Sequence, residues 1–417
     1  MSNSDKIWRA RFRPAQIFEV RRMSLIRFLR RSTALSLLLL ALVLALCALS
    51  APGVATEAAR QKYLFYVGTY TDHGSKGIYA YRFDSATGES TSLGLAAEST
   101  APSFLAIARN GQFLYAVNEM SQFNGQPTGA VSAFAIQPKT AKLMLLNQVS
   151  SHGAGPAHIA LDRSGRYALV SNYDSGNVAV FPVMQDGRLG EATAFVQHKG
   201  SSVNKERQEG PHAHAAVFSP DNRFVIVADL GLDQLLVYRF DAAHGTLGSD
   251  PQIVRAVPGA GPRHLVFDST GRYLYAINEM QSTVAAYAYD AANGTLGELQ
   301  IVSALPRGFA RTSEAAEIEM HSSGKFLFAS NRGDDSIAVF AVNTNDGALT
   351  LVEVDSTGGK TPRNFVLDPT GAWLLAANQD SDDIVVFRVD PGTGHLTRSG
   401  PELHVPSPVC VRFVPGP

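Results

Sequence analysis

Histidine, arginine and glutamate side chains stand at matching places along this sequence, beside short apolar runs typical of β-strands. They lie at the start of an apolar run at His158, His214, Arg263, His264 and Arg363, and they follow one at Glu119, Glu279 and Arg332. A histidine can take a proton from water, a carboxylate can orient it, and guanidinium groups can bind an anion or an oxyanion. This combination suits hydrolysis of an activated ester such as a lactone, provided that the fold brings the residues together.

A long polar connection enters the same part of the sequence. Residues 198–211 (HKGSSVNKERQEGP) come just before His212 and His214. Long connections are often functional or form lids, and Lys205 and Arg207 in this one can either meet an anion or lie on a solvated face. We expect Arg207 and His212 to contribute to substrate binding.

The apolar runs belong to a repeated unit. The clearest copy is PRHLVFDSTGRYLYAINE from Pro262, and related copies begin near residues 102, 156, 214, 316 and 362. The second run of each copy ends on a polar residue, at Asn118, Asn172, Asp229, Asn278, Asn331 and Asn378, with spacings of 54, 57, 49, 53 and 47. Thr69, 49 residues before Asn118, marks a seventh unit. Regular repeats of this length indicate a solenoid, a propeller or an array.

Each unit contains four short runs rich in Val, Tyr, Phe and Leu, separated by turns that contain Gly, Asn or Asp. Such runs indicate strands rather than helices. We therefore predict an all-β, seven-bladed β-propeller with four-stranded antiparallel blades. The first unit lacks an inner strand, and the chain ends with PVCVRF from Pro408 in the frame of an inner strand. This C-terminal strand should complete the N-terminal blade and close the ring.

Antiparallel pairing predicts where the polar residues lie. The start of a blade's first strand and the end of its second strand meet at one rim near the axis, so the histidines, arginines and glutamates should gather there. Polar groups that converge on a concave place are the default active-site hypothesis. Of these residues, His214, Arg263 and Glu279 are favoured for catalysis. The repeated Asn residues are expected to be structural, because Asn satisfies turn backbone.

The N-terminal region differs from the rest of the chain. Residues 34–49 are almost wholly apolar and follow five arginines, a pattern typical of a secretory signal peptide. We predict a signal peptide or N-terminal membrane anchor at 1–50, a linker at 51–62 and one propeller domain at 63–415. Export is expected, to the periplasm if the signal is cleaved.

Charge and motifs exclude several classes of function. Residues 1–50 hold nine Lys and Arg against two acidic residues, so 27 basic and 35 acidic residues remain of the 36 and 37 in the whole chain. An acidic body disfavours nucleic-acid binding. The sequence contains no G-x-S-x-G, P-loop, C-x-x-C or H-E-x-x-H motif. We predict no cofactor and no metal ligands, and a small-molecule partner.

Several blades carry the motifs of a known family. The segments HKGSSVNKERQEGPHAHAAVFSPDNRF, GAGPRHLVFDSTGRYLYAINE, SNYDSGNVAVFPV and PRNFVLDPTGAWLLAANQ resemble the lactonase-type seven-bladed propellers. That family includes bacterial 6-phosphogluconolactonases and the fungal 3-carboxy-cis,cis-muconate lactonising enzyme. The resemblance covers about residues 63–415 and implies a propeller hydrolase that opens a sugar-acid δ-lactone without an obligatory metal.

The resemblance also assigns roles. It places the catalytic histidine on His214, the two arginines on Arg263 and Arg332, and the glutamate on Glu279. His214 is then the general base or acid, Glu279 orients it or shares its proton, and the arginines bind the anionic substrate and the oxyanion. The remaining polar residues of the rim are expected to bind substrate: His158, His212, His264, Glu119, Arg363 and Arg207.

Three functions stay open at this point. The first is a lactone hydrolase, and export would favour an unphosphorylated aldonolactone over cytoplasmic 6-phosphoglucono-δ-lactone. The second is a muconate-type cycloisomerase, for which a pocket poor in Asn and Gln would argue. The third is a non-catalytic binding propeller, which has no need for a His, Arg and Glu cluster.

Overall fold

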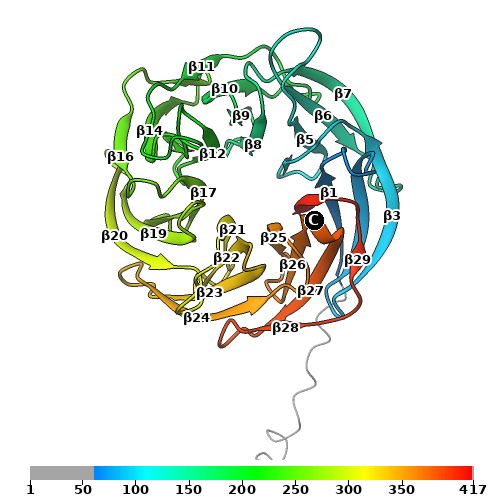
Figure 1. Cartoon of the computed structure of the whole chain (residues 1–417). Helices are drawn as coiled ribbons and strands as arrows, with labels where there is room; N and C mark the ends of the chain where they lie inside the picture. Colours follow the sequence, from blue (N-terminus) through cyan, green and yellow to red (C-terminus); the bar gives the residue numbers. More distant parts are fainter. Residues whose placement is uncertain (1–60, 416–417) are drawn as a thin grey trace, which may run out of the picture. The chain divides into compact units, whose positions relative to one another are not determined.

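The computed structural model describes residues 61–415, and in them nearly every apolar run is a β-strand. The strands form seven separate antiparallel sheets, which follow one another around a ring (Figure 1). The predicted all-β, seven-bladed propeller is therefore confirmed. A three-residue 3-10 helix, η2 (Gln379–Ser381), is the only helical element within residues 61–415. The predicted signal peptide or anchor, residues 1–50, lies outside the described residues.

Blade 1 joins the two ends of the described chain. Its inner strand is β30 (Pro408–Phe413), which pairs with β1 (Lys62–Thr69), and β2 (Gly77–Asp84) and β3 (Glu89–Glu98) follow outward. Phe65 lies opposite Phe413 in the β1–β30 ladder, and Val67 lies opposite Val411. The C-terminal strand thus completes the N-terminal blade, as the sequence predicts.

Four further blades each hold four strands, listed here from the axis outward. Blade 2 contains β4 (Leu105–Ile107), β5 (Phe113–Asn118), β6 (Ala130–Ile136) and β7 (Leu143–Ser150); blade 3 contains β8 (Pro156–Leu161), β9 (Tyr167–Asn172), β10 (Asn177–Pro182) and β11 (Ala194–Gln197). Blade 5 contains β17 (Pro262–Phe267), β18 (Tyr273–Asn278), β19 (Thr283–Asp290) and β20 (Thr295–Ser303); blade 6 contains β21 (Glu314–Met320), β22 (Phe326–Arg332), β23 (Ser336–Val342) and β24 (Leu349–Ser356).

In two of the blades, the outermost strand is interrupted and forms two short strands. Blade 4 contains β12 (Ala213–Phe218), β13 (Phe224–Asp229) and β14 (Gln234–Asp241), edged by β15 (Thr246–Leu247) and β16 (Gln252–Arg255). Blade 7 contains β25 (Pro362–Leu367), β26 (Trp373–Asn378) and β27 (Asp383–Val389), edged by β28 (Leu396–Arg398) and β29 (Leu403–His404). Pro251 and Pro401 fall in the two breaks, and proline has no N–H to give to a ladder.

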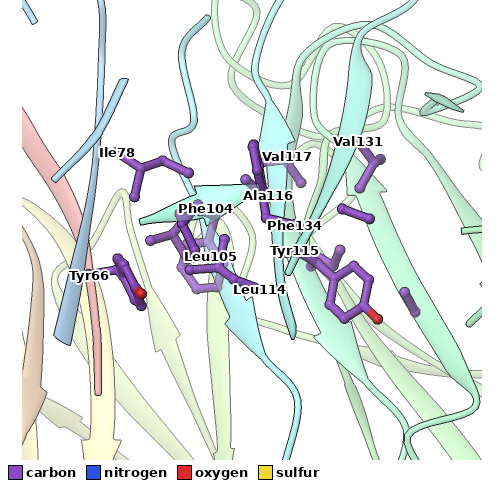
Figure 2. Close-up of a cluster of buried hydrophobic side chains, with 14 of the residues drawn as sticks. Tyr66, Ile78, Phe104, Leu105, Leu114, Tyr115, Ala116, Val117, Val131 and Phe134 are labelled. Atoms are coloured by element: carbon purple, nitrogen blue, oxygen red, sulfur yellow. The ribbon is translucent and has the colours of Figure 1, made fainter. Parts of the chain in front are cut away.

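The core lies between neighbouring blades. The second strands β9, β13, β18 and β26 are buried at every residue, because an adjacent blade covers each of their faces. Figure 2 shows one such cluster, in which Tyr66 and Ile78 of blade 1 lie on the side of blade 2 that carries Phe104 and Leu105. Burying apolar surface of this kind contributes about 25 cal/mol per Å², so the blade contacts hold the ring that positions the axial residues.

Candidate active site

Irregularities in the innermost strands place two successive side chains near the axis. In β17, Pro262 pairs with Asn278 and His264 pairs with Ile277, so Arg263 lies in a bulge between them. Ladders of β8, β12 and β25 shift at the same place, which puts Ala157, His214 and Arg363 at the position of Arg263. Bulges re-aim side chains and are common beside active sites. His214, Arg263 and Arg363 consequently line one small pocket together with Glu119 and His264.

Glu279, directly after β18, is the centre of an arginine cluster. Its Oε2 accepts from the Arg263 Nε at 2.9 Å and pairs with an Arg332 terminal nitrogen at 2.8 Å, while Arg207 binds its Oε1. Arg207 also donates to Glu314 at 2.7 Å. The Glu279 side chain is only 4% exposed, so this is a buried carboxylate held by three guanidinium groups.

Charge in this cluster shifts two pKa values. Burial alone would raise the pKa of Glu279, but the charges of Arg332, Arg263 and Arg207 lower it to about 2. Burial lowers the pKa of Arg263 to about 10, and the nearby Arg332 and Arg363 act in the same direction. At neutral pH both groups are still charged, so Arg263 is a fixed positive charge at the edge of the pocket.

His214 is buried, and no group within residues 61–415 forms a hydrogen bond with its Nδ1 atom. The ring of Tyr173 meets it edge-on at 5.5 Å between centroids, and His264 does so at 5.1 Å. Burial, followed by the charge of Arg263, lowers the pKa of His214 well below the ordinary 6.5. His214 is therefore a neutral imidazole at physiological pH, able to accept a proton.

The structure places Glu279 differently from the expectation that it orients His214. No hydrogen bond joins the two residues within the described chain, because arginine donors occupy the Glu279 carboxylate. Glu279 instead fixes Arg263 beside His214.

The other rim residues lie around the same mouth. The Tyr70 hydroxyl donates to Glu119 at 3.0 Å, and the Arg363 guanidinium lies over the Tyr70 ring at 5.3 Å. His212 stacks on Tyr173 at 4.5 Å, with its Nδ1 bonded to the Tyr173 carbonyl at 3.0 Å. Arg363 has no carboxylate within salt-bridge distance among residues 61–415, so it is a cation left available for a ligand.

Residues 198–211 are fastened to blade 4 by Asp229. Its carboxylate accepts from the His198 Nδ1 at 2.6 Å and from the backbone N–H groups of His212 and Leu232 at 2.8 and 3.1 Å. Four other blades end their second strand with Asn, and in blade 6 Asn331 is the last residue but one. Asp229 takes the same place in blade 4, where the long connection must be held. The connection then brings Arg207 to Glu279, so Arg207 pairs with a buried carboxylate and does not lie on a solvated face.

His158 lies below the pocket, and His264 lines both the pocket and the cavity beneath it. They border a second axial cavity of about 260 Å³ with Glu317, Glu319 and Arg412. Burial raises the pKa of Glu319 to about 8. His158 is buried, and its Nδ1 has no hydrogen-bond partner in the described part of the chain. The structure thus brings His264 to the pocket with Glu119 and Arg363, but not His158.

The sequence profile of the family described as "Lactonase, 7-bladed beta-propeller" matches residues 64–413. The chain belongs to this lactonase family. A relative from Bacillus subtilis named 6-phosphogluconolactonase is 39% identical over 85% of this chain and 99% of its own length. Another of that name, from Formosa agariphila, is 37% identical over 73% of this chain and 86% of its own. The solved structure of a Pseudomonas aeruginosa periplasmic gluconolactonase has a TM-score of 0.80 at 37% identity, covering 85% of this chain and 99% of that one.

Sequence reasoning missed several residues at the mouth of this lactonase-family propeller. Tyr70 and Tyr173 follow Thr69 and Asn172, in the frame that places Glu279 after Asn278. The same frame therefore places both tyrosines at the rim. Glu314 gave no signal, because it precedes the recognisable part of its repeat. In the described part of this lactonase-family chain, no group of three or more His, Cys, Asp or Glu is placed to hold a metal ion.

Proposed function

We propose that this lactonase-family protein hydrolyses the ring ester of a sugar-acid lactone, with His214 as general base. The observation that carries the proposal is a neutral, buried imidazole with a free Nδ1 that shares a pocket with Arg263 and Arg363. The names of the relatives from B. subtilis and P. aeruginosa support the reaction class. A binding propeller would have no use for this arrangement.

The proposed reaction consumes one water. His214 takes a proton as the water oxygen attacks the lactone carbonyl carbon, and the carbonyl oxygen becomes an oxyanion. Arg263 and Arg363 stabilise that charge in a site largely shielded from solvent. The ring C–O bond then breaks, and the departing ring oxygen takes the proton back from His214, which yields the open hydroxy acid. Glu279 holds Arg263 in place and also pairs with Arg332, while Glu119, His212 and Arg207 surround the sugar hydroxyls.

Charge at the mouth favours an unphosphorylated substrate. Four arginines (Arg207, Arg263, Arg332 and Arg363) face three carboxylates (Glu119, Glu279 and Glu314), which leaves one net positive charge. One charge matches the single carboxylate of an aldonate product. It does not match a phosphate dianion, nor the several carboxylates of a carboxymuconate. We therefore propose an aldonolactone such as glucono-δ-lactone.

A comparison of two lactones tests this proposal. We expect kcat/KM for glucono-δ-lactone to exceed that for 6-phosphoglucono-δ-lactone by about tenfold or more, because part of the charge of a phosphate dianion would remain unpaired. A tenfold difference corresponds to about 1.4 kcal/mol. The measurement is initial rates for both lactones at one ionic strength, with spontaneous hydrolysis subtracted. A preference for the phosphorylated lactone would show that the mouth binds phosphate; no activity on either would overturn the hydrolase.

We also propose that the protein is exported. The basic and apolar pattern of residues 1–50 supports this, as does the periplasmic relative of known structure. Within residues 61–415 no helix has the length and apolarity needed to cross a bilayer. Cell fractionation of the tagged full-length chain should find it in the periplasm or at the membrane facing it, and recovery in the cytoplasm would contradict the proposal.

A further inference from the structure

A chain of hydrogen bonds runs from the candidate active site down the axis of the ring. The Arg263 Nη1 donates to the His264 Nε2 at 3.2 Å, and the His264 Nδ1 bonds to the Glu317 Oε1 at 2.9 Å. The second Glu317 oxygen accepts from the Asn364 side chain. The Asn364 Oδ1 in turn accepts from the Val411 backbone N–H at 2.8 Å, so the chain ends on the closing strand β30.

This chain permits only one protonation state of His264. A guanidinium can only donate, so the His264 Nε2 must accept, and the imidazole proton must lie on Nδ1, where it is donated to Glu317. The groups that surround His264 are Arg263, Glu317, Arg412, His158 and His214. Burial lowers the pKa of His264 to about 4, with Glu317 opposing and Arg263 reinforcing the shift, which agrees with a neutral ring.

We propose that His264 and Glu317 are positioning residues that hold the Arg263 guanidinium beside His214. The proposal rests on the proposed lactone hydrolysis. Arg263 is held at Nε by Glu279 and at Nη1 by His264 and the Ala316 carbonyl, the last at 2.7 Å. Its Nη2 has no hydrogen-bond partner within residues 61–415. The fixed contacts thus leave one N–H edge of the guanidinium for the substrate.

The fold itself does not require a histidine at this position. Ala215 in β12 and Cys410 in β30 stand where His264 stands in β17, each paired one residue beyond the bulge. The blades therefore close around a small side chain at this level. A buried Arg, His and Glu chain costs desolvation free energy that an alanine would avoid, so its presence beside the pocket points to the reaction.

Two amide substitutions at the buried position 264 distinguish a positioning role of the histidine from a packing role. The Oε1 of glutamine in His264→Gln can replace the acceptor Nε2, whereas asparagine in His264→Asn reaches only the place of Nδ1. We expect His264→Ala and His264→Asn to lower kcat by about 10- to 100-fold, the cost of a misplaced catalytic group, with little change in KM. His264→Gln should keep kcat within about threefold. Equal losses in the Gln and Asn variants would overturn the proposal.

A double-mutant cycle tests whether the effect passes through Arg263. In an Arg263→Gln background, His264→Ala should change kcat by less than about twofold, because the group that it positions is gone; independent effects would multiply. His321→Ala is the matched control. His321 is also buried with both ring nitrogens bonded, to Ser323 and to the Gly371 carbonyl, and it is expected to keep wild-type kcat.

A spectroscopic measurement is independent of activity. In wild-type full-length protein with 15N-labelled imidazoles, the His264 signals are identified as those that disappear in His264→Gln. At neutral pH they should show a protonated Nδ1 and an unprotonated Nε2. The opposite tautomer would overturn the proposal. If the wild type hydrolyses no lactone, the proposed function fails. If it is active and His264→Ala equals the wild type, only the positioning role fails.

Discussion

We expect His214→Ala to hydrolyse its lactone about 10²- to 10⁴-fold more slowly than the wild type, the usual contribution of a general base. His214 is the one neutral imidazole that lines the pocket with both Arg263 and Arg363 and keeps a nitrogen free. The loss should fall on kcat rather than KM, because the proton is transferred in the transition state. Initial rates at saturating lactone measure it, with the uncatalysed rate subtracted.

The variant should remain folded. Ala157 occupies the bulge of β8 that corresponds to His214 in β12, so the ring already accepts alanine there. Circular dichroism and denaturant unfolding should match the wild type, and His321→Ala should retain its activity. Wild-type turnover by a folded His214→Ala protein would remove this residue from the mechanism.

The pH profile supplies a second test of the same residue. A base works only when it is deprotonated, and burial beside Arg263 lowers the pKa of His214 below 6.5. The wild type should therefore keep its full kcat/KM at pH 6 and lose activity only in more acidic buffer. The residual rate of His214→Ala should lack this fall.

Glu279→Gln should lower the free energy of unfolding by about 3–5 kcal/mol, the cost of breaking a buried ion pair. Without its carboxylate, Arg207 and Arg332 keep only the charge of Glu314 as a paired carboxylate among residues 61–415, and Arg263 loses its one salt bridge there. Chemical denaturation followed by tryptophan fluorescence measures the loss. Glu314→Gln is the matched control: it belongs to the same cluster but is 37% exposed, so we expect a change below about 1 kcal/mol.

The same carboxylate predicts how stability depends on pH. Its pKa is lowered from 4.5 to about 2 in the folded protein, so its contribution is complete above about pH 4.5 and is lost as the pH falls toward 2. Wild type and Glu279→Gln should accordingly converge in stability over that range. A constant difference between them would show that the lost free energy is not electrostatic.

Much of the fold could be predicted because every blade repeats one frame. The polar residue at the end of each second strand, Thr69 in blade 1 and Asn278 in blade 5, gives the number and order of the blades. The closing strand could be predicted because PVCVRF has no second strand after it. The split outer strands of blades 4 and 7 were not predicted, since they depend on where Pro251 and Pro401 interrupt a ladder.

The place of the candidate residues in the fold could be predicted from the sequence, but their pairing could not. Sequence placed His214, Arg263, Glu279 and Arg332 at one rim because strand direction decides that. It could not show that Arg207 would cross from another blade to Glu279, since this depends on the path of a long connection. Nor could it separate Arg263 from His264, because a bulge, not strict alternation, puts these neighbours at two levels of the axis.

Pairing between β1 and β30 also governs how the chain reaches its native state. Phe65 and Phe413 lie at opposite ends of the described chain, and contacts of such large sequence separation form slowly because closing the intervening loop costs entropy. Until residues 408–413 have left the ribosome, β1 keeps an open hydrogen-bonding edge of the kind that invites aggregation. Ring closure is thus expected to be the late, rate-limiting event of folding, and Asn364 can accept its hydrogen bond from Val411 only once it has happened.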